Sequence, residues 1–272
     1  MMKGFILSVR SEFYKSRKTL GFWCSIVLPL LIVSLMFIGF ITHSDKLGHL
    51  PGMMLWMSYV GPISIVMGNL LLPMYIIFVA YSVNAMEHKA DTWKTLFTLP
   101  ISKWAVYSAK YFYALFLVFF CLLLFYVFLL GSGNLLSVLK PDLKFNDFHI
   151  EGFLAQVYLK LFLVSLGILS IQFLLSLVWS DFLKPMGIGF VCTIASLIAV
   201  GVGWQYAYFI PYAHPALALN GLMRTPRPTP GQVPSPPKLT IDMLTNEVYV
   251  SLVVAVVIFI LGFFIVQKKS VK

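Results

Sequence analysis

The stretch SAKYFYALFLVFFCLLLFYVFLL, residues 108–130, decides the fold of this chain. Its only charged side chain is Lys110, which stands near its start. A helix needs ~20 predominantly apolar residues to cross a hydrocarbon core that is ~30 Å thick. Residues 108–130 therefore predict a helix that spans a lipid bilayer.

Composition extends this prediction to the whole chain. Of its 272 residues, 60% are hydrophobic and only 11% are charged, and the mean hydropathy is +0.89. So little polar surface cannot cover a water-soluble globule. We therefore predict an all-α integral membrane protein with a single transmembrane domain over residues 1–272. Six stretches have the length and composition of spans: residues 20–42, 58–83, 108–130, 153–178, 186–209 and 248–266. The short link between the fourth and fifth predicts a tight antiparallel pair.

The net charge of +10 argues against a nucleic-acid partner once its pattern is considered. Lysines and arginines gather at the ends of apolar runs and form no continuous basic surface. The three cysteines, Cys24, Cys121 and Cys192, are far apart within apolar runs. They lack the spacing of metal ligands, so we interpret them as buried hydrophobic residues and predict no metal site.

Basic residues in the flanks predict the orientation, because short loops rich in Lys and Arg stay in the cytoplasm. With the N-terminus inside, thirteen of the 20 basic residues fall on the cytoplasmic side and six on the outer side, and Lys160 lies within the fourth span near its outer end. Both termini are therefore expected in the cytoplasm. The chain has no Asn-x-Ser/Thr sequon, which fits a multi-pass protein of the bacterial plasma membrane.

Residues 1–19 have the pattern of a helix that lies in the membrane interface. On a helical wheel, one arc of about 100° holds Met2, Phe5, Ile6, Val9 and Phe13. Another side holds the cations Lys3, Arg10, Arg17 and Lys18. Apolar residues would sink among lipid tails while the cations contact anionic headgroups. The alternative is a solvated, charged leader.

The cytoplasmic segment 84–107 also contains a helical face. Ala90, Trp93, Leu96 and Phe97 recur at helical spacing, and Pro100 ends the segment sharply. Lys103 and Lys110 are expected to anchor the third span at the interface. A short helix that exposes Trp and Phe could fill a pocket in a soluble partner. The alternative is an interfacial helix that lies on lipid.

On the outer side, residues 210–247 contain a short predicted helix followed by a proline-rich loop. The sequence IPYAHPALALNG, residues 210–221, has prolines that pre-set turns and then good helix formers. Six prolines among residues 224–238 predict an extended loop.

The sequence offers no catalytic residues of its own. It has no His-Glu-x-x-His helix, no Gly-x-Ser-x-Gly elbow and no phosphate-binding Gly-x-x-x-x-Gly-Lys-Ser/Thr loop. Ionisable residues are also scarce within the spans, which argues against a transporter driven by protons or sodium. Energy for any work would have to come from another chain.

Two stretches resemble a known family. Residues 12–23 (EFYKSRKTLGFW) and 86–110 (MEHKADTWKTLFTLPISKWAVYSAK) are similar to the permease subunits of type-2 ABC exporters, above all to the lantibiotic-immunity and bacitracin-resistance group. Positions that match the pattern of the family's first cytoplasmic loop are Glu87, Thr92, Leu96, Leu99, Pro100, Ser102, Lys103 and Lys110. Relatives often have a small residue before the Thr, where this chain has Asp91.

This resemblance implies that the segment 84–107 docks on a separate ABC ATPase subunit, which would bind ATP and magnesium, and that two permeases pair, identical or homologous. The residues expected to couple to the ATPase are Glu87, Thr92, Trp93, Leu96, Phe97 and Pro100. The function implied is that of a non-enzymatic permease that exports an amphiphilic peptide, antibiotic or lipid-like molecule. The alternative is a non-transporting scaffold or immunity factor that captures a peptide with its outer loops.

Overall fold

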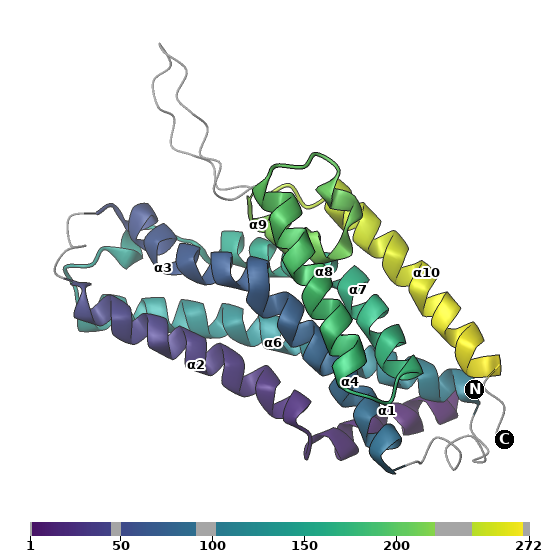
Figure 1. Ribbon diagram of the computed structural model, residues 1–272. Coiled ribbons are helices and arrows are strands. Elements are labelled where there is room, and N and C mark those ends of the chain that lie inside the picture. Colours follow the sequence, from purple (N-terminus) through teal and green to yellow (C-terminus); the bar gives the residue numbers. More distant parts are fainter. Residues whose placement is uncertain (1, 45–49, 91–101, 221–240, 269–272) are drawn as a thin grey trace.

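A computed structural model describes residues 2–44, 50–90, 102–220 and 241–268, with helices and no strand in these ranges. Figure 1 shows the arrangement of the helices. The long elements are α1 (Met2–Ser16), α2 (Leu20–Thr42), α3 (Gly52–Val66), α4 (Leu72–Ala90), α6 (Lys103–Leu139), α7 (Glu151–Val178), α8 (Leu183–Gly201) and α10 (Asn246–Lys268). The shorter ones are the π-helix η2 (Met67–Leu71), the helix α9 (His214–Asn220) and the 3₁₀ turns η3 (Phe145–Asp147), η4 (Ala207–Phe209) and η5 (Pro211–Ala213).

Six helices in the described ranges are long and apolar enough to cross a membrane. The prediction of an all-α integral membrane protein is therefore confirmed. The second, Gly52–His88, runs through α3, η2 and most of α4, and it and the third, α6, each have 37 residues. At 1.5 Å per residue each is ~55 Å long, so each must tilt or extend beyond a ~30 Å hydrocarbon core.

The fifth spanning helix is shorter than its apolar run. The run was expected to continue to residue 209, but α8 ends at Gly201 and Gly203 follows with φ +72. Glycine adopts this left-handed conformation at little cost, so the chain turns here although its composition remains apolar. Residues 202–209 therefore form a turn and the short η4.

The second spanning helix is distorted just before Pro73. Pro73 has no N–H to give to the carbonyl of Asn69, and the helix widens into η2 just before it. The short outer helix α9 packs against this site. A methyl group on Gly68 would collide with Leu219 of α9, so Gly68 permits the close approach.

The helices pack around α6 and α7. Helices α1 and α2 lie against α6, and α7 contacts α10 and α4 extensively. Helix α8 packs more against α4 than against α7, so the expected tight pair of the fourth and fifth spans is not its main contact. In Figure 1, α1 lies at the same end of the bundle as the end of α4, the start of α6 and the end of α10, opposite α3 and α9.

Candidate coupling site

Helix α1 is attached to α6 along one face that mixes apolar and polar residues. Ser8, Glu12 and Ser16 are buried on this face. Phe13, also on α1, packs edge to face on Tyr113 of α6 with ring centroids 4.9 Å apart. The hydroxyl groups of Ser16 and Tyr113 form a hydrogen bond. These contacts fix α1 against the start of α6.

A cluster of four charged residues lies at the centre of this contact, and we call it the ion cluster: Glu12 and Lys15 of α1, Glu87 of α4 and Lys110 of α6. Lys110 Nζ lies 2.6 Å from Glu87 Oε2 and 3.1 Å from Glu12 Oε2. Lys15 Nζ lies 3.3 Å from Glu87 Oε1 and 3.6 Å from Glu12 Oε1. Two cations and two anions thus join three helices.

Because the ion cluster is largely buried, its contribution to stability depends on every one of its contacts. The side chains of Lys110 and Glu87 are only 1% and 2% exposed. Lys110 Nζ also donates to the backbone carbonyl of Val83 at 3.2 Å, which offsets part of its lost hydration. Ions taken from water lose several kcal/mol each, and this loss is repaid only while every partner is in place. The position of α1 is therefore tied to those of α4 and α6.

A chain of polar contacts continues from α4 to α7. Asn84, one turn before His88, donates from Nδ2 to Ser176 Oγ at 2.8 Å. The Nε2 of His88 donates to the carbonyl of Ser176 at 2.9 Å. Ser176 Oγ itself donates to the carbonyl of Ala80 at 2.9 Å. The end of α4 is therefore held from both sides, by the ion cluster and by α7.

Of the six expected coupling residues, the structure describes only Glu87. Thr92, Trp93, Leu96, Phe97 and Pro100 lie outside the described residues. Glu87 is described, and its carboxylate faces Lys110 and Lys15 in the interior. In this chain Glu87 thus ties the end of α4, directly before the segment 91–101, to α1 and α6.

The expected membrane-interface residues have different environments. Ile6 is 61% exposed, and Phe5 packs edge to face on Phe112 of α6 at 5.9 Å. Val9 is half-buried, and Arg17 and Lys18 are exposed beyond the end of α1. Lys103, the first residue of α6, donates to the carbonyl of Gln267 at 3.3 Å. Lys110 lies inside the ion cluster.

Sequence reasoning did not single out Glu12 or Lys15. A signal for Glu12 was present, since it stands seven residues after Phe5 and four after Ser8 and therefore shares their helical face. The position of Lys110 within an apolar run was a second signal, because a cation at such a position needs a buried partner. The sequence alone did not indicate which acid would be that partner.

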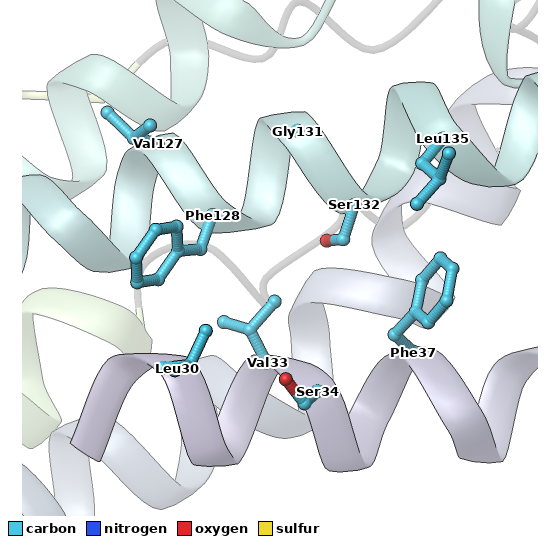
Figure 2. A pocket seen from close by; sticks show the side chains of 9 residues that line it. All are labelled: Leu30, Val33, Ser34, Phe37, Val127, Phe128, Gly131, Ser132 and Leu135. Carbon is cyan, nitrogen blue, oxygen red and sulfur yellow. The ribbon is translucent and has the colours of Figure 1, made fainter. Parts of the chain in front are cut away.

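A separate groove lies between α2 and α6, within the spanning region. Its volume is about 430 Å³, and its walls are apolar except for Ser34 and Ser132. Figure 2 shows Leu30, Val33 and Phe37 of α2 pointing toward Val127, Phe128 and Leu135 of α6. Ser132 Oγ accepts a hydrogen bond from Tyr59 at 2.7 Å and donates to the carbonyl of Leu129.

The opposite end of the bundle has its own ion pair. Lys160 of α7 lies 3.2 Å from Glu247 of α10, and both side chains are largely buried. Nearby, Nε2 of His214 donates to the carbonyl of Tyr208 at 2.8 Å. Burial lowers the pKa of His214, against smaller opposing effects of the Tyr208 carbonyl and the Glu247 charge. This ion pair fixes α10 to α7.

The fold and the ion cluster define a multi-pass membrane protein whose spanning helices are tied at one end to a peripheral helix. A family model described as ABC-2 family transporter protein matches residues 8–196, well over half of the 272 residues. The chain therefore belongs to this family and is a type-2 ABC permease, the membrane component that works with ABC ATPase subunits. No curated protein and no solved structure matched the chain.

Proposed function

We propose that this chain is the permease of an ATP-driven exporter and that the segment 91–101 is its contact with the ATPase. The observation that carries the proposal is the ion cluster. It joins the helix that leads into this segment, α4, to α6, which follows it, and to α1. A push on the segment would thus move three helices together, as a switch between two packed arrangements requires.

The coupling residues would act in two ways. Trp93, Leu96 and Phe97 would fill a pocket on the ATPase, with Thr92 and Pro100 shaping the segment. Glu87 would transmit the displacement through Lys110 rather than touch the partner. ATP and magnesium would bind to the ATPase and not to this chain. Two permease copies, or this chain and a homologue, would pair around a central path.

The groove between α2 and α6 and the basic flanks bear on the substrate and on the location of the permease. The apolar groove with two serine hydroxyls supports a substrate that carries a hydrocarbon portion, such as an amphiphilic peptide, an antibiotic or a lipid-like molecule. Export and membership of the lantibiotic-immunity and bacitracin-resistance group are inferred from the resemblance of residues 12–23 and 86–110. The basic flanks support a bacterial plasma membrane protein with both termini in the cytoplasm.

The double substitution Trp93→Ala with Phe97→Ala tests the coupling segment. We expect the permease to remain in the membrane but to copurify with less ATPase, since loss of a central aromatic anchor costs on the order of 2 kcal/mol or more. Substrate-stimulated ATP turnover should fall as well. The matched control is Trp23→Ala, which removes a half-exposed indole from α2 and should leave the ATPase-to-permease ratio unchanged.

Two results would contradict the proposal. An unchanged ratio with unchanged stimulation would show that the segment lies on lipid instead. Absence of any copurifying ATPase from the unmodified protein would favour the alternative function, a scaffold that captures a peptide with its outer loops.

A further inference from the structure

A pocket of about 530 Å³ lies at the elbow between α1 and α2. Three parts of the chain line it: the elbow itself at Lys18 to Leu20, one face of α4, and Phe182 in the α7–α8 connection. In Figure 1 this is the end of α2 that meets α1. It is separate from the groove between α2 and α6 and plays no part in the coupling proposal.

The walls of this elbow pocket are mostly apolar. Phe78 and Ala85 of α4 contribute to them. The rings of Tyr81 and Phe182 meet edge to face with centroids 4.8 Å apart. Because these walls belong to the ends of spanning helices, the pocket opens where acyl chains meet headgroups. A bound molecule must therefore present a hydrocarbon portion.

The elbow pocket has four polar side chains, and that of Thr19 is already engaged, because its hydroxyl donates to the Ser16 carbonyl at 2.8 Å. Ser82 Oγ accepts from the backbone N–H of Gly21 at 3.2 Å, and within the described residues its own proton has no acceptor. The Tyr81 hydroxyl likewise has no partner there, and the exposed Lys18 ammonium forms no ion pair in the same ranges. None of the described residues that line the pocket carries a carboxylate. Glu87, directly after Met86, is engaged by Lys110 and Lys15.

We propose that the elbow pocket binds a phospholipid with an anionic headgroup. The acyl chain would pack against Phe78, Ala85 and Phe182, and the phosphate would accept hydrogen bonds from Lys18 and Ser82. Helix α2 begins at Leu20, so the positive end of its dipole adds to the attraction for a negative charge. The lipid comes from the leaflet on the α1 side, which is the cytoplasmic leaflet in the proposed orientation.

Such a lipid has a structural consequence. It touches the elbow, α4 and the α7–α8 connection at once, so it stabilises their arrangement at the end of the bundle that carries the ion cluster. The lipid is thus a bound component of the permease and is distinct from any transported molecule.

Native mass spectrometry of the full chain in detergent tests this proposal. Added phosphatidylglycerol should bind as one tight equivalent and raise the midpoint of thermal unfolding. Phosphatidylcholine of the same chain length should do so much less, because its headgroup carries no net charge. Glycerol phosphate, which has the anion but no acyl chain, should not compete at equimolar concentration.

Three substitutions assign the binding to the elbow pocket. Lys18→Gln should weaken phosphatidylglycerol binding about fivefold, the effect of one basic residue near an anionic lipid surface. Met86→Trp should abolish the tight equivalent, because the larger side chain occupies the pocket. The control Arg10→Gln removes the same charge from an exposed position on α1 that does not line the pocket, and it should bind like the unmodified protein.

Each opposite result would overturn the proposal. Equal binding of the two phospholipids would remove the role of the anion. Effective competition by glycerol phosphate would identify a plain anion site. Equal losses of phosphatidylglycerol binding in Lys18→Gln and Arg10→Gln would show that the basic residues of α1 and the elbow attract anionic lipid in general, without a specific site. Because Lys18 and Arg10 are exposed, both variants are expected to fold, and their elution on gel filtration checks this.

Discussion

At the scale of single residues, Lys110 shows how strongly a buried charge depends on its partners. It is the only described cation of the ion cluster that is fully buried, and it faces two carboxylates. Without it, Lys15 would be the one cation among the described residues that contacts Glu12 and Glu87, and its side chain is 32% exposed. Leaving a buried charge without its partner costs more than the intact pair contributes to stability.

We therefore expect Lys110→Met to lower the free energy of unfolding by about 3–5 kcal/mol. Denaturant unfolding of the purified protein in detergent measures this loss. Adding Glu12→Gln and Glu87→Gln to the same variant should restore much of the stability, because no uncompensated acid then remains.

The control for this prediction is Lys103→Met, at the first residue of the same helix. Lys103 donates to the Gln267 carbonyl and is partly exposed, so the loss should be much smaller. Equal losses in the two variants, or no recovery in the triple variant, would contradict the structural importance of the ion cluster.

At the scale of elements, two glycines on α8 differ in what they face. A methyl group on Gly189 would overlap the side chains of Gln172 and Ile77, so the helix approaches α4 and α7 through this position. A methyl group on Gly187, half a turn earlier, would have no atom within 4 Å. Substitution of Gly189 therefore tests the packing of α8, whereas substitution of Gly187 tests only the preference of the new residue for a helix.

We expect Gly189→Ala to destabilise the protein by about 1–3 kcal/mol, the usual cost of extra atoms in a packed interior. Gly187→Ala should be neutral or slightly stabilising, because Ala favours a helix over Gly by up to about 1 kcal/mol. Thermal unfolding of both variants in the same detergent measures the difference. Similar midpoints would show that α8 does not pack tightly through Gly189.

The elements also show what could be predicted from sequence. Apolar runs are local, so the six spans were predictable. The end of α8 was not, because Val202 and Trp204 continue the apolar composition beyond Gly201. The burial of Glu12 was missed for another reason. It depends on Phe13 and Ser16 packing against Tyr113, which is about a hundred residues away in the chain.

At the scale of the whole molecule, the charged flanks predict the orientation in the membrane, and labelling from outside the cell tests it. Two positions at opposite ends of the bundle suit this test. The His149 side chain is 90% exposed near the start of α7, and Lys268 is exposed at the end of α10.

In intact cells, a membrane-impermeant maleimide should label His149→Cys and should not label Lys268→Cys. Breaking the membrane should make the second cysteine reactive. The unmodified chain, with Cys24, Cys121 and Cys192 inside spanning helices, serves as the control for background. Labelling of Lys268→Cys from outside would reverse the orientation and place the segment 91–101 away from any cytoplasmic ATPase.

The order of the ion cluster along the chain has a consequence for biosynthesis. Glu12, Lys15 and Glu87 leave the ribosome before Lys110 does, so a growing chain carries both acids at the membrane surface before their main partner exists. Only insertion of α6 supplies the lysine that neutralises them. A nascent chain that stalls between residues 91 and 110 therefore holds Glu12 and Glu87 without their buried partner, a local defect that sets an unfinished permease apart from a completed one.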